Sequence, residues 1–139
     1  MIICGDSKYK EAAEFYAEKL GIPDETIIAI GLYTGMEIAG YCEYHDDEAL
    51  PYFLIGIDTE EQGEDDPLST LAHEIVHVRQ YVTEELVDKN SYCLWKGKRY
   101  EAVEVDTEDY YTSPWEIDAY GRQVGLYKMY LRYQEGCEK

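Results

Sequence analysis

The chain is poor in basic residues. Its 139 residues include 12 lysines and arginines against 30 aspartates and glutamates, so the formal net charge is −18. Such a field repels phosphate backbones, and this disfavours a nucleic-acid partner. It also keeps a small protein soluble, and a peptide substrate of so acidic a protein would more readily be cationic.

Long apolar runs and close cysteine pairs are also absent. No run of about eighteen apolar residues occurs, and no cationic segment precedes an apolar one at the amino terminus. The sequence therefore predicts neither a membrane span nor an export signal. C-x-x-C spacing is absent among the four cysteines, which favours reduced thiols in a cytoplasmic protein: Cys4, Cys42, Cys93 and Cys137. The length predicts a single domain, 1–139.

Two of the three histidines stand four residues apart, in His73-Glu74-Ile75-Val76-His77. On a helix this spacing puts both imidazoles on one face, where both can reach one metal ion. Zinc held by neutral histidines lowers the pKa of its bound water to about 7, and a neighbouring carboxylate can take the proton as the water attacks a carbonyl. The HExxH pentapeptide therefore predicts a hydrolytic zinc site in which Glu74 is the base.

The surrounding residues predict a helix from about Asp66 to about Leu86. Its apolar stripe has the i, i+3, i+4 spacing of a face packed on a core and consists of Leu68, Leu71, Ala72, Ile75 and Val76. His73 and His77 point almost opposite to the centre of that stripe. We therefore expect both to face a cleft or solvent. A solvated pair of histidines that binds no metal is the alternative.

A catalytic zinc site has three protein ligands and one open position. His45, in an acidic loop, is a weak candidate for the third ligand. Glu116 is the stronger one, because Ser113 and Pro114 begin a second long helix. Its predicted apolar face consists of Ile117, Tyr120, Val124, Tyr127 and Leu131. Glu116 lies at the edge of that face and points inward, where a metal would compensate its charge. Alternatively, Ser113-x-x-Glu116 forms a capping box.

A helix with HExxH followed by a helix with a glutamate, here in Glu116-Ile117-Asp118-Ala119, resembles the gluzincin clan of zinc metallopeptidases. The short chain is similar to the small single-domain members of that clan, the minigluzincins. The resemblance extends over about residues 68–123. It implies that His73, His77 and Glu116 are zinc ligands and that Glu74 is the general base and acid.

One position departs from the pattern of the clan. Larger gluzincins often have an aspartate four residues after the glutamate, where it orients a zinc-bound histidine, and this chain has Tyr120 there. Tyr120 and Asp118 are the candidates for that role. Tyr110, Tyr111 and Arg122 are candidates for stabilising the oxyanion of a transition state. Packing of their apolar parts, with the polar end in water, is the alternative.

The order of segments predicts an α+β fold, which by resemblance is zincin-like with the metal at the bottom of a cleft. We expect a strand at 1–4, an amphipathic helix at 7–20, and strands at 26–32, 36–44 and 52–58 in a small, largely antiparallel sheet. A hairpin at 91–94 and 99–105 turns at 96–98. In related peptidases the substrate adds to an edge strand of the sheet, and either 36–44 or 52–58 could be that edge.

These patterns together predict a zinc-dependent metallopeptidase that acts on a peptide or protein substrate, with neither a nucleic-acid nor a membrane partner. Two other functions stay open. One is a non-enzymatic acidic binding protein, either a nucleic-acid mimic or an inactive zincin scaffold. The other is a zinc hydrolase of a non-peptide amide bond, such as one in a cell wall.

Overall fold

The computed structural model describes residues 2–46, 51–60, 66–102 and 107–137. Separate helical and strand segments make up 47% and 28% of the structure, and the predicted α+β class is confirmed. In chain order the elements are β1 (Ile2–Cys4), α1 (Ser7–Leu20), β2 (Ile27–Tyr33), β3 (Gly40–His45), β4 (Tyr52–Asp58), α2 (Pro67–Val82), β5 (Leu86–Asp88), β6 (Tyr92–Trp95), β7 (Lys98–Glu101), α3 (Glu108–Tyr111) and α4 (Pro114–Cys137).

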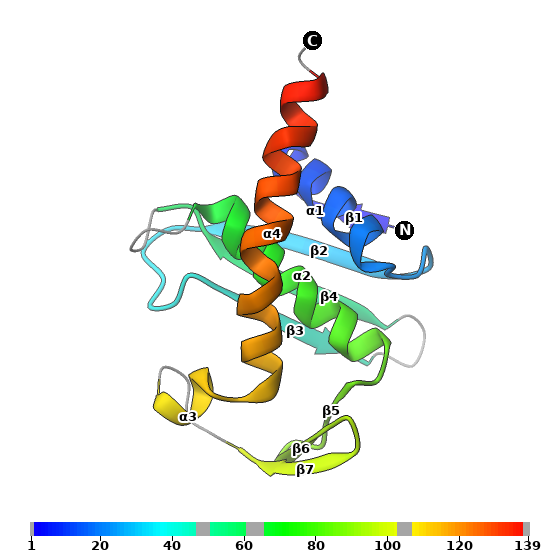
Figure 1. Cartoon of the computed structure of the whole chain (residues 1–139), viewed down its shortest axis with the longest axis vertical. Coiled ribbons are helices and arrows are strands. Elements are labelled where there is room, and N and C mark those ends of the chain that lie inside the picture. Colours follow the sequence, from blue (N-terminus) through cyan, green and yellow to red (C-terminus); the bar gives the residue numbers. More distant parts are fainter. Residues whose placement is uncertain (1, 47–50, 61–65, 103–106, 138–139) are drawn as a thin grey trace.

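The larger sheet has four strands in the order β1-β2-β4-β3 (Figure 1). β1 and β4 both run parallel to β2, and only β3 runs antiparallel to its neighbour β4. The expectation of a largely antiparallel arrangement is wrong for this sheet. The helix α1 connects β1 to β2, and a helical crossover returns the chain in the direction in which it started.

β3 forms one edge of this sheet, while β4 lies inside it. Of the two segments that could supply an edge, only the first does so. The strand begins at Gly40, later than predicted, because the preceding turn is tied to the end of β4. There the backbone N–H of Met36 donates to a carboxylate oxygen of Asp58 at 2.8 Å, and the Asp58 N–H donates to the carbonyl of Ala39 at 2.9 Å.

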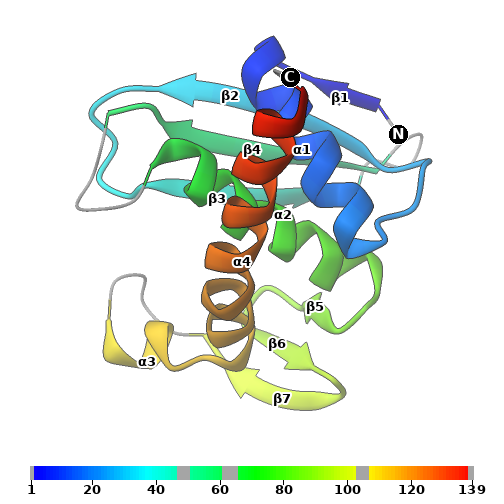
Figure 2. The same cartoon turned by 45° about the horizontal axis from the view of Figure 1, so that its top comes forward.

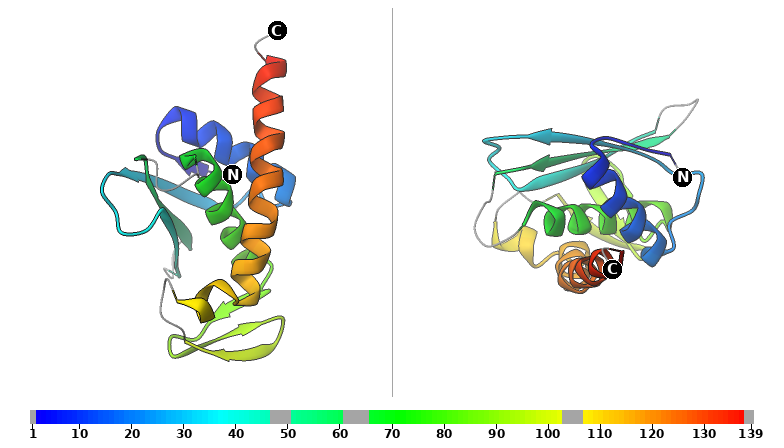
Figure 3. Two further views of the ribbon diagram at one scale, coloured as in Figure 1. Left: turned by 60° about the vertical axis from the view of Figure 1, so that its left-hand side comes forward. Right: turned by 90° about the horizontal axis from the view of Figure 1, so that it is seen from above.

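Helices cover one face of the sheet in two layers (Figure 3). α1 and α2 lie against the strands, and α4 packs on the outer side of α2. The apolar core lies between these layers, and within it the hydroxyl of Tyr16 donates to the carbonyl of Leu68 at 2.9 Å. α2 is therefore enclosed by the sheet on one side and by α4 on the other. None of the described helices has the length and apolar character of a membrane span.

The boundaries of α1 and α2 follow their capping residues. α1 covers the predicted residues, from the Asp6 cap to Gly21, which adopts a left-handed φ of 69°. The apolar stripe of α2, which we predicted to pack on the core, is buried along its whole length. α2 begins after Asp66, as expected, but ends at Val82, because Glu84 has a positive φ of 60°. Leu86 then starts β5, where it pairs with Trp95.

The strands β5, β6 and β7, which lie between α2 and α3 in the chain, form a second, antiparallel sheet (Figure 2). The predicted hairpin corresponds to β6 and β7, and its turn contains Lys96 and Gly97, both with positive φ. Part of the segment expected for the second strand, 103–105, lies outside the described residues. β5 and the short helix α3 were not predicted from the sequence.

The face of α4 that packs inward differs from the predicted one. Four of the five residues expected to face the core are exposed, at 58%, 43%, 55% and 38% of their surface: Ile117, Tyr120, Val124 and Leu131. The buried positions are Glu116, Ala119, Gln123, Leu126 and Tyr130. The prediction was wrong because it ranked the two faces by apolar content, whereas two polar residues of the buried face have partners on α2.

Candidate metal centre

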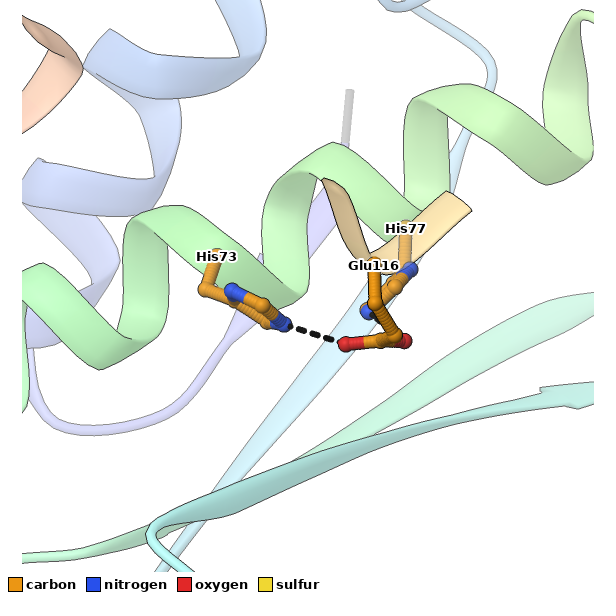
Figure 4. Close-up of side chains that lie close together, drawn as sticks. All are labelled: His73, His77 and Glu116. Carbon is orange, nitrogen blue, oxygen red and sulfur yellow. Dashed lines mark hydrogen bonds and ion pairs between the residues drawn. The ribbon is translucent and has the colours of Figure 1, made fainter. Parts of the chain in front are cut away.

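The two histidines of the HExxH segment and Glu116 converge between α2 and α4 (Figure 4). One carboxylate oxygen of Glu116 lies 3.0 Å from Nε2 of His73, and the other lies 3.0 Å from Nε2 of His77. The donor atoms of the three residues all lie within 4.8 Å of one another. In a tetrahedral zinc site the ligand atoms are about 3.3 Å apart, given metal–ligand distances of about 2.0–2.1 Å. The group could therefore hold a metal ion after small rotations.

All three side chains are buried. His73 and His77 are 6% and 7% exposed and Glu116 is 3% exposed. We expected the histidines to face a cleft or solvent, and the structure turns both toward α4 and leaves neither in solvent. His77 and Glu116 still line a pocket, so one side of the group is accessible.

The structure also shows where the two candidates for the third ligand lie. The hydroxyl of Ser113 donates to the carbonyl of Asp109 at 2.8 Å, while both carboxylate oxygens of Glu116 face the histidines. The capping box is therefore not formed. His45 stands apart from the group at the end of β3, where its ring contacts Glu43 at 3.1 Å. It is not among the residues that could share the metal.

His77 and Glu116 each shift the pKa of the other. Burial alone would lower the pKa of His77, but the hydrogen bond to Glu116 and the charge of Glu74 raise it to about 9. For Glu116 the directions are reversed. Burial alone would raise its pKa, but hydrogen bonds from His73 and His77 lower it to about 2. A divalent cation replaces these contacts in such a site, because it takes neutral imidazoles and an ionised carboxylate.

The remaining ring nitrogen of each histidine is held by a glutamine. Nδ1 of His73 lies 3.0 Å from Oε1 of Gln123, and Nδ1 of His77 lies 2.8 Å from Oε1 of Gln80. An amide oxygen only accepts hydrogen bonds, so with the amides in these orientations each Nδ1 donates to its glutamine, and each Nε2 faces Glu116. Metal-binding histidines have the same arrangement, in which an outer partner fixes the ring and its tautomer.

Sequence reasoning did not identify these two glutamines. Gln80 follows His77 by three residues, on the same face of α2. Gln123 follows Glu116 by seven residues, on the same face of α4. Helical spacing could therefore have placed both near the histidines. The fold class could not, because it does not say which faces of α2 and α4 meet.

Glu74 lies beside the group, on the side of α2 that faces β3. It is 6% exposed, and burial raises the pKa of its carboxyl group, while the neighbouring histidines oppose this. The strand β3 approaches closely here. A Cβ atom at Gly40 would lie 3.3 Å from a carboxylate oxygen of Glu74 and 2.9 Å from a methyl group of Thr70. The absence of a side chain at Gly40 thus lets the edge strand pass next to Glu74.

A pocket of about 240 Å³ opens onto Glu74, His77 and Glu116. Its other walls come from β3 and the segment before it, from the end of α2, from β5, and from α3 and the start of α4: Ile38, Gly40, Tyr41, Cys42, Tyr81, Leu86, Tyr110 and Trp115. Apart from the group itself, these walls are mostly aromatic or aliphatic. None of the described lining residues is a lysine or an arginine.

The five further candidates lie at different distances from the group. Tyr110 lines the pocket, and its phenol hydrogen-bonds Glu116; burial, followed by the charge of Glu116, raises the pKa of the phenol. Tyr120 packs its ring on His73, with centroids 4.3 Å apart. Tyr111 is 44% exposed and contacts Tyr120 and Tyr110, not the pocket.

Arg122 and Asp118 form an ion pair at 2.8 Å on α4 and do not line the pocket. Arg122 is therefore not placed to stabilise an oxyanion. Asp118 accepts a hydrogen bond from Gln80 at 3.0 Å, so it touches His77 only through that residue. The Nδ1 atoms of the two histidines contact Gln123 and Gln80, while Tyr120 contacts the ring of His73.

Metal binding should release protons below about pH 9. His77 binds a metal only as the neutral imidazole, and its contact with Glu116 keeps it protonated at pH 7 in protein stripped of metal, because its pKa is about 9. We expect the apparent affinity for zinc to rise with pH up to about 9 and to level off above it. Calorimetry at pH 7 in buffers of different ionisation enthalpy measures the release, and heats that do not depend on the buffer would contradict it.

Comparison of the chain with models of known protein families, with curated proteins and with solved structures finds no match.

Proposed function

We propose that this protein is a zinc-dependent metallopeptidase. The observation that supports the proposal most is the convergence of His73, His77 and Glu116 on one point, with the carboxylate of Glu74 in the same pocket. Zinc bound by two imidazoles and a carboxylate acidifies a water molecule and polarises a carbonyl group. The resemblance to gluzincins assigns the same four roles to the same four residues.

Glu74 is suited to move the proton in this reaction. Its raised pKa lies closer to neutrality than that of an exposed glutamate, which favours a group that must accept a proton and release it again. Glu74 accepts a proton from the attacking water and then donates it to the amine that leaves. Tyr110 stays a neutral phenol because its pKa is raised, and it can donate a hydrogen bond to the oxyanion.

The edge strand β3 offers a place for the substrate backbone. One side of β3 is paired with β4, and the strand passes the site at Gly40, Tyr41 and Cys42, which line the pocket. An extended peptide can add to such an edge through backbone hydrogen bonds and place alternate side chains in pockets. The aromatic and aliphatic walls suit an apolar side chain next to the bond that is cleaved.

Metal content and hydrolysis test the proposal together. We expect purified protein to contain about one zinc ion per chain, as a site with three protein ligands does. We also expect it to cleave members of a mixture of quenched fluorescent peptides, to lose this activity with a chelator and to regain it with zinc. A protein that takes up no metal from excess zinc would exclude the proposal. A protein that binds zinc, leaves peptides intact and cleaves cell-wall amides would favour the alternative, a hydrolase of non-peptide bonds.

A further inference from the structure

A chain of hydrogen bonds runs from His77 to the surface of α4. Oε1 of Gln80 lies 2.8 Å from Nδ1 of His77. Nε2 of the same amide donates to the carbonyl of Trp115 at 2.9 Å and to a carboxylate oxygen of Asp118 at 3.0 Å. Gln80 is fully buried, with 0% of its surface exposed. The other carboxylate oxygen of Asp118 accepts from Arg122 at 2.8 Å.

The partners of Gln80 leave its amide only one orientation. The carbonyl of Trp115 and the carboxylate of Asp118 accept hydrogen bonds and cannot donate them. The NH₂ group must therefore face them, and the amide oxygen must face His77. As a result, in the neutral imidazole that binds a metal, the proton of His77 is held on Nδ1 and the lone pair of Nε2 points to the metal position.

Asp118 can satisfy Gln80 and Arg122 together only as a carboxylate. Both neighbours are donors, and a carboxylate accepts from each with a different oxygen. An asparagine would have to turn its NH₂ group toward one of these donors. The orientation of the buried amide thus depends on the charge of a partly exposed residue on another helix.

The support of His73 is less restrictive. Nε2 of Gln123 lies 3.0 Å from the hydroxyl of Ser69, and a hydroxyl can either donate or accept. Ser69 is therefore compatible with either orientation of the Gln123 amide. Of the two histidines, only His77 has a tautomer determined by groups that can do nothing but accept.

We propose that Gln80 is the positioning residue of His77, and that Asp118, through the Gln80 amide, sets how tightly the centre holds its metal. The proposal rests on the metal site of the proposed function. It also explains why residue 80 is a glutamine and not a glutamate, although a carboxylate would polarise His77 more strongly. A carboxylate there would face the carbonyl of Trp115 and the carboxylate of Asp118 at hydrogen-bond distance, with no proton between them.

A double-mutant cycle between positions 80 and 118 tests the proposal. We expect Gln80→Glu to weaken zinc binding by about 10–100-fold, the usual effect of changing an outer partner of a metal ligand, and Asp118→Asn, which acts through Gln80, to weaken it by up to about that factor. Combined in one chain, the two changes reverse the polarity of the contact, because the new amide at 118 donates to the new carboxylate at 80. We expect the double variant to bind zinc more tightly than either single variant. The matched control Ser69→Ala should weaken binding less than Asp118→Asn.

Zinc affinity is measured in the intact chain by competition with a chromophoric chelator. Nitrogen NMR of the zinc-bound protein shows which ring nitrogen of His77 carries the proton. If Gln80 and Asp118 had a purely structural role, their substitution would not change this tautomer. Single variants that bind zinc like the unmodified chain, or a double variant in which the two losses multiply, would overturn the proposal. If Gln80→Glu does not fold, Asp118→Asn and the double variant still give the comparison. Failure of the unmodified chain to bind zinc would instead refute the proposed function.

Discussion

The variant Glu74→Gln should bind zinc as tightly as the unmodified chain and lose its hydrolytic activity. Glu74 lies in the pocket with His77 and Glu116 but is not one of the three residues that could hold the ion. Glutamine has the same shape and cannot accept the proton of water. General-base catalysis contributes about 10²–10⁴-fold to a rate, so we expect kcat/KM to fall by about that factor.

The measurement combines kcat/KM for a cleaved peptide with the zinc content of the same preparation. A matched control is Glu14→Gln, the same chemical change at an exposed position of α1, which should keep full activity. Unchanged hydrolysis by Glu74→Gln would show that another group moves the proton. Loss of both zinc and activity would instead mean that Glu74 supports the site structurally.

His77→Ala should abolish stoichiometric metal binding. The change removes one of the three residues that could hold the ion, and it also removes the contacts of His77 with the amide oxygen of Gln80 and with one oxygen of Glu116. Each buried polar group that loses its hydrogen bond costs about 1–3 kcal/mol, so the variant should also melt at a lower temperature than the unmodified chain.

His45→Ala is the natural control, since it removes the one histidine outside the group. His45 is half-buried, and its ring contacts Glu43 at 3.1 Å and stacks on Tyr52. We expect this variant to retain its zinc in elemental analysis. Equal zinc content in both variants would show that the ion is not bound where His73, His77 and Glu116 meet.

The acidic composition bears on the kind of substrate more than on the chemistry. A net charge of −18 repels anionic partners at long range, and the described lining of the pocket offers no cation to a substrate carboxylate. Both features favour an internal peptide bond with an apolar neighbour over a terminal residue with a free carboxylate. The charge also makes cationic peptides the first to include in a substrate screen.

Local patterns along the chain were enough to predict several features of the site. Spacing of four residues placed His73 and His77 on one face of a helix, and capping residues located the starts of α2 and α4. The inward direction of Glu116 was also predicted, although from an apolar face that proved to be exposed. These features depend on helix geometry and on backbone hydrogen bonding within a turn, and both are determined by neighbouring residues.

The sequence alone therefore determined most of the elements and the residue types that could bind a metal, whereas the tertiary structure decided which faces meet. The directions of the strands, the edge position of β3 and the inner face of α4 all depend on contacts between residues far apart in the chain. Gln80 and Gln123 show the reason most clearly. Burying a polar side chain is unfavourable in itself and becomes acceptable only when a distant partner satisfies it, and a linear pattern does not contain that partner.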